Sequence, residues 1–252
     1  QLYIDLNGAD LHFYREGATA STVINVNDEY LVKIENFDTM REQMEFLRMY
    51  PDSCFQKVLC SNEELSYVCF EFIKGEKFSE AEIDASDAIE QICEIVCSYG
   101  EYTHKGYGFL GHEKDSWHDF LLDEIEYAEQ RIPEVSKDKV MAALEVAGRE
   151  EPQQYLTHGD FGTHNFLVEK GRIRVIDPMP AVADYLYDFY FALLSDVDVF
   201  IRLGEEMVMS YFERDVEYKK ALLIIALYVR MSRAAKYDAA NLQKYKDLYA
   251  NI

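Results

Sequence analysis

The chain has 252 residues, 49% of them apolar and 14% aromatic, so it can bury a substantial core and is not a disordered segment. It carries 47 Asp and Glu against 25 Lys and Arg, a formal charge of −22, which disfavours nucleic acid and anionic membranes as partners and favours cationic small molecules. The five cysteines fit no closed disulfide framework, and the longest strongly apolar run, 221–229, is far shorter than the roughly 20 residues of a membrane span. We therefore expect a soluble cytoplasmic protein with free thiols, either a monomer or a homodimer.

The first 73 residues predict a mainly β domain. Apolar and β-branched runs at 11–14, 22–26 and 30–34 are separated by turn residues, a pattern typical of consecutive strands. The loop between the first two runs contains Gly17 and Ser21, small residues that would let backbone N–H groups approach a phosphate. A plain hairpin loop is the alternative, and the chain has no Walker A motif, which disfavours a P-loop NTPase.

The third run is followed by a predicted helix. Lys33 lies in that run with Val32 and Ile34 on the opposite face, and a solvated lysine is the ordinary interpretation. Residues 38–50 carry apolar side chains at helical spacing, and 55–60 and 65–73 predict a further hairpin. From residue 76 onward the pattern is chiefly helical, with predicted helices at 85–100, from 117, at 137–148, from 184, and two or three after 208.

Residues 157–188 carry the clearest chemical pattern. The runs 166–168 and 173–176 flank a Glu169–Gly171 turn, and this hairpin would bring Asn165 close to Asp177, with Asp160 in the loop before it. Carboxylate and amide oxygens suit Mg²⁺, and a nearby carboxylate can accept the proton of an attacking hydroxyl. A single Asp in such a loop is more often turn chemistry.

Histidines in the same region leave a second metal hypothesis open. His158 and His164 could bind zinc, and Asp10-Leu11-His12 together with Gly159-Asp160 is similar to the pattern of a binuclear metallophosphoesterase. That site would need further histidines late in the chain, and none follows His164.

The segment resembles the catalytic and metal-binding region of the aminoglycoside phosphotransferase family, relatives of the protein kinases. The resemblance rests on His158-Gly159-Asp160, then Asn165, then Ile176-Asp177, with Ala183 to Asp188 similar to the family's following acidic stretch. Pro178 and Ala183 depart from the usual residues of that pattern without removing a ligand. The resemblance implies an α+β, bilobal protein-kinase-like fold, with a small β-rich N-lobe at 1–73 that binds nucleotide and a larger, mainly helical C-lobe at 74–252.

The resemblance also implies roles for individual residues. Asp160 would be the catalytic base, Asn165 and Asp177 would hold Mg²⁺, and Asp188 would brace the catalytic loop. Lys33 would bind phosphates of ATP or GTP, and Glu42 would position it, with Glu45 as the rival. Phe70 would border the adenine, while the Glu71 carbonyl and the Ile73 amide would meet the edge of the base.

The implied reaction is transfer of the γ-phosphate to a hydroxyl of an aminoglycoside-like antibiotic. Such an acceptor is a polycation that acidic side chains would bind, and the candidates are Asp119, Asp123, Glu124 and Glu126, or acidic residues at the end of the chain. A kinase of another small hydroxylated metabolite, choline-, homoserine- or fructosamine-like, is the alternative, as is a non-catalytic nucleotide-binding pseudokinase. The absence of an A-P-E motif after Asp177 disfavours a protein substrate.

Overall fold

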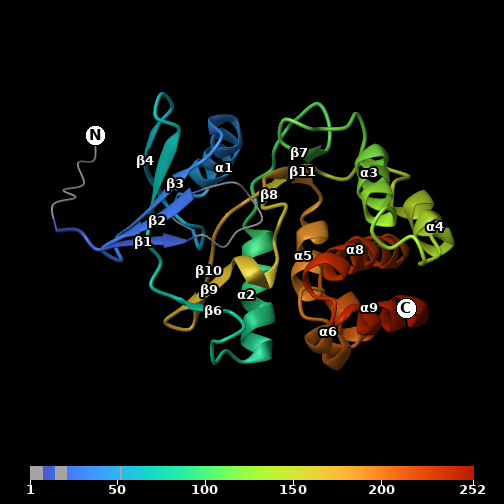
Figure 1. Cartoon of the computed structure of the whole chain (residues 1–252). Coiled ribbons are helices and arrows are strands. Elements are labelled where there is room, and N and C mark those ends of the chain that lie inside the picture. The colour runs from blue at the N-terminus through green and yellow to red at the C-terminus, as the bar shows by residue number, and fades with distance from the viewer. Residues whose placement is uncertain (1–7, 15–21, 52) are drawn as a thin grey trace. The chain divides into compact units, whose positions relative to one another are not determined.

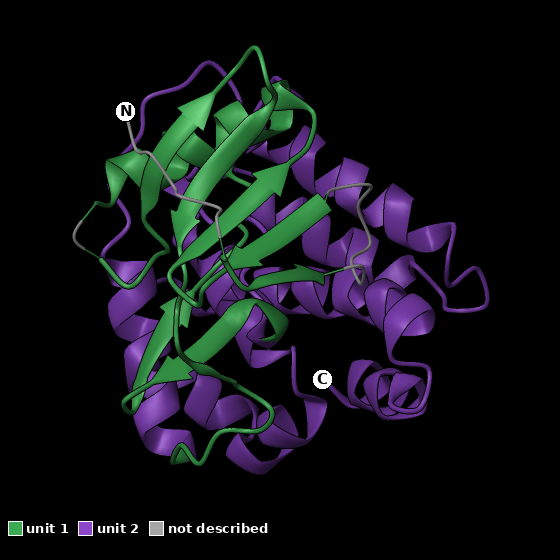
Figure 2. Ribbon diagram, turned by 60° about the vertical axis from the view of Figure 1, so that its left-hand side comes forward, with its two compact units in different colours: residues 1–84, 164–180 green, residues 85–163, 181–252 purple. Residues whose placement is uncertain are grey.

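The chain divides into two compact units in the computed structural model, which describes residues 8–14, 22–51 and 53–252. Unit 1 comprises residues 1–84 and 164–180, and unit 2 comprises residues 85–163 and 181–252 (Figure 2). This division differs from the predicted boundary at residue 73. Strand β6 (Glu76–Lys77) pairs with β9 (Phe166–Glu169), and this pairing holds the segment after residue 73 and the 164–180 hairpin in unit 1.

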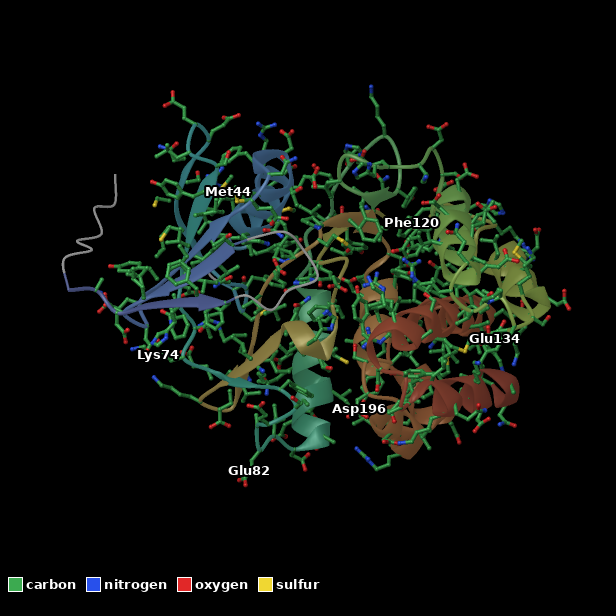
Figure 3. All side chains as sticks on the ribbon, viewed as in Figure 1. Met44, Lys74, Glu82, Phe120, Glu134 and Asp196 are labelled. Carbon is green, nitrogen blue, oxygen red and sulfur yellow. The ribbon has the colours of Figure 1, made fainter. Side chains whose placement is uncertain are left out.

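Unit 1 contains a five-stranded antiparallel sheet of order β1-β2-β3-β5-β4 (Figure 1). Its strands are β1 (Leu11–Tyr14), β2 (Thr22–Val26), β3 (Tyr30–Ile34), β4 (Val58–Asn62) and β5 (Tyr67–Glu71). The first three have the bounds that the sequence predicts. Helix α1 (Phe37–Met49) begins at Asn36, whose side chain accepts a hydrogen bond from the Asp38 N–H. Met44 is labelled on α1 in Figure 3 and belongs to its buried face.

A second, three-stranded sheet of unit 1 has the order β10-β9-β6. Strands β9 and β10 (Arg172–Val175) form the predicted hairpin, with Val175 opposite Phe166 and Arg172 opposite Glu169. Lys170 and Gly171 form its turn with φ of 53° and 77°, the left-handed pair that suits a two-residue hairpin and that glycine adopts without strain. Backbone hydrogen bonds link Val175 to Cys54 and Gln56, so the hairpin is fixed to the segment that precedes β4.

Unit 2 is built around helix α8 (Val216–Tyr237), which packs against α3, α4, α5 and α9 (Figure 1). Residues 221–229 of α8 are buried, as expected for a stretch that is apolar all round. The other helices of this unit are α2 (Ala85–Cys97), α3 (Trp117–Glu129), α4 (Asp138–Ala147), α5 (Tyr185–Leu193), α6 (Val197–Leu203), α7 (Glu205–Ser210) and α9 (Leu242–Asn251). Helices are thus found in all the regions where the sequence predicts them.

A small buried sheet in unit 2 sets the loop that contains Asp160. It has the order β7-β11-β8 and consists of β7 (Gly108–Phe109), β8 (Tyr155–Thr157) and β11 (Ala181–Ala183). Strand β8 leads directly into His158, and β11 leads into Asp184, which caps α5 by accepting a hydrogen bond from the Leu186 N–H at 3.0 Å. Pairing of β8 with β11 therefore brings the start of the 158–163 loop beside the start of α5.

All five cysteines are free thiols. Within residues 8–14, 22–51 and 53–252, the structure contains no helix that combines the length and apolar character needed to cross a bilayer.

Candidate active site

Lys33 is a buried lysine in the middle of the larger sheet of unit 1, where β3 places it opposite Val23 of β2 and Val68 of β5. Its ammonium nitrogen lies 2.8 Å from Oδ1 of Asp177 and 3.1 Å from Oε2 of Glu35. Burial alone would lower the pKa of Lys33, but the two carboxylates outweigh it and raise that pKa above its ordinary value. Lys33 is therefore a fixed cation, not the solvated lysine of the ordinary interpretation.

Gln43 on α1 links Lys33 to Asp177. Its Oε1 accepts a hydrogen bond from the Lys33 ammonium at 3.3 Å, and its Nε2 donates one to Asp177 Oδ1 at 3.2 Å. An amide side chain can make both contacts because it carries an acceptor and a donor. Gln43 lies one position after the expected Glu42, and the helix turns it toward its buried face. The roles assigned to Glu42 and to its rival Glu45 stay predictions.

Asn165 and Asp177 lie at the open end of the β9–β10 hairpin, as the sequence predicts. The Ile176 N–H donates to the Asn165 carbonyl at 3.0 Å, which sets Asn165 beside the residue that precedes Asp177. Asp177 has a φ of 54°, a left-handed conformation that is uncommon for a residue other than glycine.

The chemistry of these side chains fits magnesium. One carboxylate and one amide oxygen at the same end of a hairpin are hard ligands, and Mg²⁺ in phosphoryl-transfer sites is held by one or two carboxylates together with substrate phosphates. The Asp177 side chain is 54% exposed, so its oxygens are accessible to a hydrated ion. Within the part of the chain that the structure describes, there is no cluster of three or more His, Cys, Asp or Glu side chains suited to a metal ion.

Arg174, on β10, fixes the hairpin to the end of β5. Its guanidinium pairs with Glu169 at 2.8 Å and with Glu71, and its Nε donates to the Cys54 carbonyl at 3.1 Å. Glu71 was expected to offer its carbonyl to adenine, and in the structure that carbonyl accepts a hydrogen bond from Gln56 Nε2 at 2.9 Å. A carbonyl oxygen has a second lone pair that can accept another hydrogen bond, and the contact with adenine stays a prediction.

The other residues predicted to bind nucleotide differ in whether the structure describes them. Phe70 and Ile73 are buried side chains at and just after the end of β5. Gly17 and Ser21 lie outside the residues that the structure describes. The adenine and phosphate contacts assigned to these four residues stay predictions.

In unit 2, a buried carboxylate holds the loop that carries Asp160. Asp188 accepts hydrogen bonds from the His158 N–H at 2.8 Å, the Gly159 N–H at 3.2 Å and the Tyr99 hydroxyl at 2.9 Å. Gly159 has a φ of 75°, which glycine adopts without strain. Burial raises the pKa of Asp188 to about 7, although the three donors favour its ionised form. This geometry agrees with the bracing role expected for Asp188.

Asp160 forms an ion pair that the sequence did not reveal. Nη1 of Arg233, on α8, lies 2.7 Å from Asp160 Oδ1, and each side chain is 23% exposed. The available signal was an arginine that follows the long apolar run of α8, where a charge needs a buried partner. Nothing in the spacing of Arg233, 73 residues after Asp160, identified that partner.

The four acidic residues suggested for acceptor binding all belong to α3 but differ in environment. Glu124 is buried, accepts a hydrogen bond from the Tyr187 hydroxyl at 3.2 Å and has a raised pKa because of its burial. Asp123 pairs with Lys114 at 3.0 Å, and Asp119 and Glu126 are exposed. Of the four, Glu124 is the one that interacts electrostatically with Arg233 and Asp160.

Comparison with known proteins identifies the fold and the family. The structure is similar to that of aminoglycoside phosphotransferase APH(4)-Ia in a ternary complex with AMP-PNP and hygromycin B, with a TM-score of 0.66 at 19% identity over 96% of this chain and 93% of that one. It is also similar to a GDP and kanamycin complex of APH(2")-IIIa, with a TM-score of 0.62 at 14% identity over 98% and 93% of the two chains. A third similar structure is a putative fructosamine-3-kinase from Haemophilus somnus 129PT, with a TM-score of 0.62 at 16% identity over 96% and 92%.

These similarities confirm the predicted α+β, protein-kinase-like fold. A search of proteins with curated descriptions found no match. The sequence profile of the phosphotransferase enzyme family, by contrast, matches residues 10–222, which is most of the chain. The protein therefore belongs to the phosphotransferase enzyme family.

Proposed function

We propose that the protein transfers the γ-phosphate of ATP or GTP to a hydroxyl group of an aminoglycoside-like small molecule. The observation that carries this proposal is the contact between Lys33 and Asp177, in a chain that belongs to a phosphotransferase family. A buried ammonium beside an accessible carboxylate can bind phosphate oxygens on one side and a divalent cation on the other.

Each side chain has a defined task in this proposal. Lys33 binds phosphate oxygens of the nucleotide, and Gln43 keeps its ammonium directed toward Asp177. Asn165 and Asp177 hold Mg²⁺, which neutralises charge on the phosphates when bound. Asp160 accepts the proton of the acceptor hydroxyl as that oxygen bonds to the γ-phosphorus and the nucleoside diphosphate leaves. No covalent intermediate on the protein is required.

The nucleotide site extends to residues predicted from the family resemblance. Phe70 would border the base, and the Glu71 carbonyl and the Ile73 amide would contact its edge. Gly17 and Ser21 would lie over the phosphates. Two of the similar structures named above contain AMP-PNP or GDP, which supports nucleotide use without deciding between ATP and GTP.

Two observations support an aminoglycoside-like acceptor. The chain has a formal charge of −22, which attracts polycations, and two of the similar proteins were solved with hygromycin B or kanamycin. A different observation favours a second candidate, another hydroxylated metabolite such as a fructosamine. One of the similar structures is a putative fructosamine-3-kinase, with a TM-score of 0.62.

Nucleoside-diphosphate release from Mg·ATP and Mg·GTP tests the proposal directly. The assay would compare aminoglycosides, neutral sugars and amino alcohols as acceptors, with Asp160→Ala beside the unchanged protein. Loss of a general base lowers the rate by about 10² to 10⁴-fold, so acceptor-stimulated release should collapse in that variant. Release that no acceptor stimulates, or that survives Asp160→Ala, would contradict the proposal.

A further inference from the structure

Arg233 engages the carboxylate of the proposed base. Its guanidinium donates to Asp160 Oδ1 at 2.7 Å, and both side chains are about three-quarters buried. Both residues belong to unit 2, with Asp160 on the loop after β8 and Arg233 near the end of α8. A carboxylate held this way cannot rotate freely, because one of its oxygens is committed to a fixed cation.

Arg233 is itself held from two sides. Its guanidinium carbon lies 4.6 Å from the centre of the Phe191 ring on α5, within cation–π distance. On α3, the carboxylate of Glu124 interacts with the guanidinium and accepts the Tyr187 hydroxyl hydrogen bond. Burial alone would lower the pKa of Arg233, but Asp160 and Glu124 raise it above its ordinary value. The cation is thus permanent and its position is set by α3, α5 and α8 together.

We propose that Arg233 is a positioning residue for phosphoryl transfer, which orients the Asp160 carboxylate toward the acceptor hydroxyl. The inference rests on the proposed function, in which Asp160 accepts the hydroxyl proton. Alignment of a base with its proton matters because misplacement by about 1 Å can cost about 10²-fold in rate. A planar guanidinium braced by a ring and a second carboxylate provides that alignment in a way that a flexible lysine cannot.

In the step itself, the acceptor O–H bond breaks and its proton passes to Asp160. The acceptor oxygen forms a bond to the γ-phosphorus, and the bond from that phosphorus to the bridging oxygen breaks, which releases the nucleoside diphosphate. Arg233 neither gives nor takes a proton. Its effect should therefore appear in kcat and not in the affinity for nucleotide.

The test compares two arginines of the same helix. Arg230 lies one turn before Arg233, with its guanidinium carbon 5.3 Å from the same Phe191 ring, but it donates to the Ser195 carbonyl. Arg233→Met should lower kcat by about 10- to 100-fold with the KM for nucleotide within about twofold, while Arg230→Met should leave both within about twofold. Arg233→Lys, which keeps the charge, should fall between the unchanged protein and Arg233→Met.

A double-mutant cycle separates positioning from mere packing. If Arg233 acts through Asp160, then Asp160→Ala with Arg233→Met should be no slower than Asp160→Ala alone. Added guanidinium ion should also restore part of the rate of Arg233→Ala, whereas an equal concentration of sodium chloride should not. The positioning role would be overturned if the rate losses of Asp160→Ala and Arg233→Met were additive in the double variant. It would also be overturned if guanidinium ion restored no activity to Arg233→Ala, or if Arg233→Met were as active as Arg230→Met.

The experiments distinguish failure of the positioning role of Arg233 from failure of the proposed phosphoryl transfer. If the unchanged protein shows acceptor-stimulated turnover that is insensitive to Arg233, only the positioning role is wrong. If the unchanged protein releases no nucleoside diphosphate with any acceptor, the proposed function fails and the inference fails with it.

Discussion

The side chain of Gln43 donates a hydrogen bond to Asp177 at 3.2 Å, from a helix whose sequence offers glutamates on either side of it. The Gln43 amide is neutral, and in the contacts described Lys33 pairs with the carboxylates of Glu35 and Asp177. Two carboxylates therefore share one ammonium, and an amide completes the cluster. Exchange of that amide for a carboxylate should disturb the balance of charge at the proposed phosphate site.

Gln43→Glu should weaken nucleotide binding in the absence of Mg²⁺, since it adds a negative charge next to the phosphates. Gln43→Leu should weaken nucleotide binding by about 2- to 12-fold, because a lost hydrogen bond costs about 0.5–1.5 kcal/mol. Titration with a fluorescent nucleotide would measure both effects. Arg41→Gln is the control on α1, since Arg41 is exposed and pairs only with surface carboxylates in the contacts described, Asp38 and Glu63. Unchanged affinity in both Gln43 variants would contradict a role for this cluster in nucleotide binding.

Lys33→Met should lower both activity and stability. The stability effect follows because Glu35, whose side chain is only 14% exposed, would lose its counter-ion. Removal of one partner of a buried ion pair costs about 3–5 kcal/mol, whereas removal of both is much less costly. Chemical denaturation should therefore show that Glu35→Gln together with Lys33→Met is more stable than Lys33→Met alone. The double variant should stay inactive, because the phosphate-binding ammonium is still missing.

Activity should depend on Mg²⁺ through Asn165 and Asp177. Asp177→Asn should raise the Mg²⁺ concentration needed for half-maximal rate far more than Asn165→Ala, since a carboxylate binds the ion more strongly than an amide. Chelation of divalent cations should abolish turnover in the unchanged protein. Substitution of the exposed His164, next to Asn165, by Gln is a neighbouring control that should leave the Mg²⁺ dependence unchanged. Equal Mg²⁺ dependence in all four proteins would show that these residues are not ligands.

The raised pKa of Asp188 predicts that the stability of the protein falls as pH rises. Burial raises its pKa in the folded protein to about 7, against about 3.9 in an unfolded chain. Between these values the native state binds more protons than the unfolded state, so the free energy of unfolding contributed by Asp188 falls as pH rises, by up to about 1.4 kcal/mol per pH unit. Urea unfolding between about pH 5 and pH 7 should show this slope, and Asp188→Asn should reduce it. Asp123→Asn, an exposed position, should leave the slope unchanged.

The parts of the fold that sequence predicts are those with local patterns. The strands at 11–14, 22–26 and 30–34 follow from runs of β-forming residues between turns, and the hairpin around Lys170 and Gly171 follows from its turn chemistry. Strands β8 and β11 were not predicted, because three residues are too few to show a period. Their pairing is decided by tertiary packing within unit 2.

The side-chain contacts of the candidate site also divide into those that a local pattern predicts and those that tertiary packing decides. The approach of Asn165 to Asp177 was predictable because both flank one hairpin. The contact of Gln43 with Lys33 depends on helix phase to within one residue, about 100° of rotation, which spacing alone does not supply. The pairing of Arg233 with Asp160 joins segments 73 residues apart and depends on how α8 packs, so no local pattern could give it.

Arg174 links three segments of unit 1 that are distant in the sequence. Its guanidinium is bound to Glu71 at the end of β5, to Glu169 on β9 and to the Cys54 carbonyl, so it ties three separate segments of unit 1 at one point. Arg174 therefore links the end of β5, which is proposed to contact the nucleotide base, to the β9–β10 hairpin, which is proposed to hold the metal. We therefore expect Arg174 to hold the spacing between the proposed base-binding and metal-binding segments within unit 1.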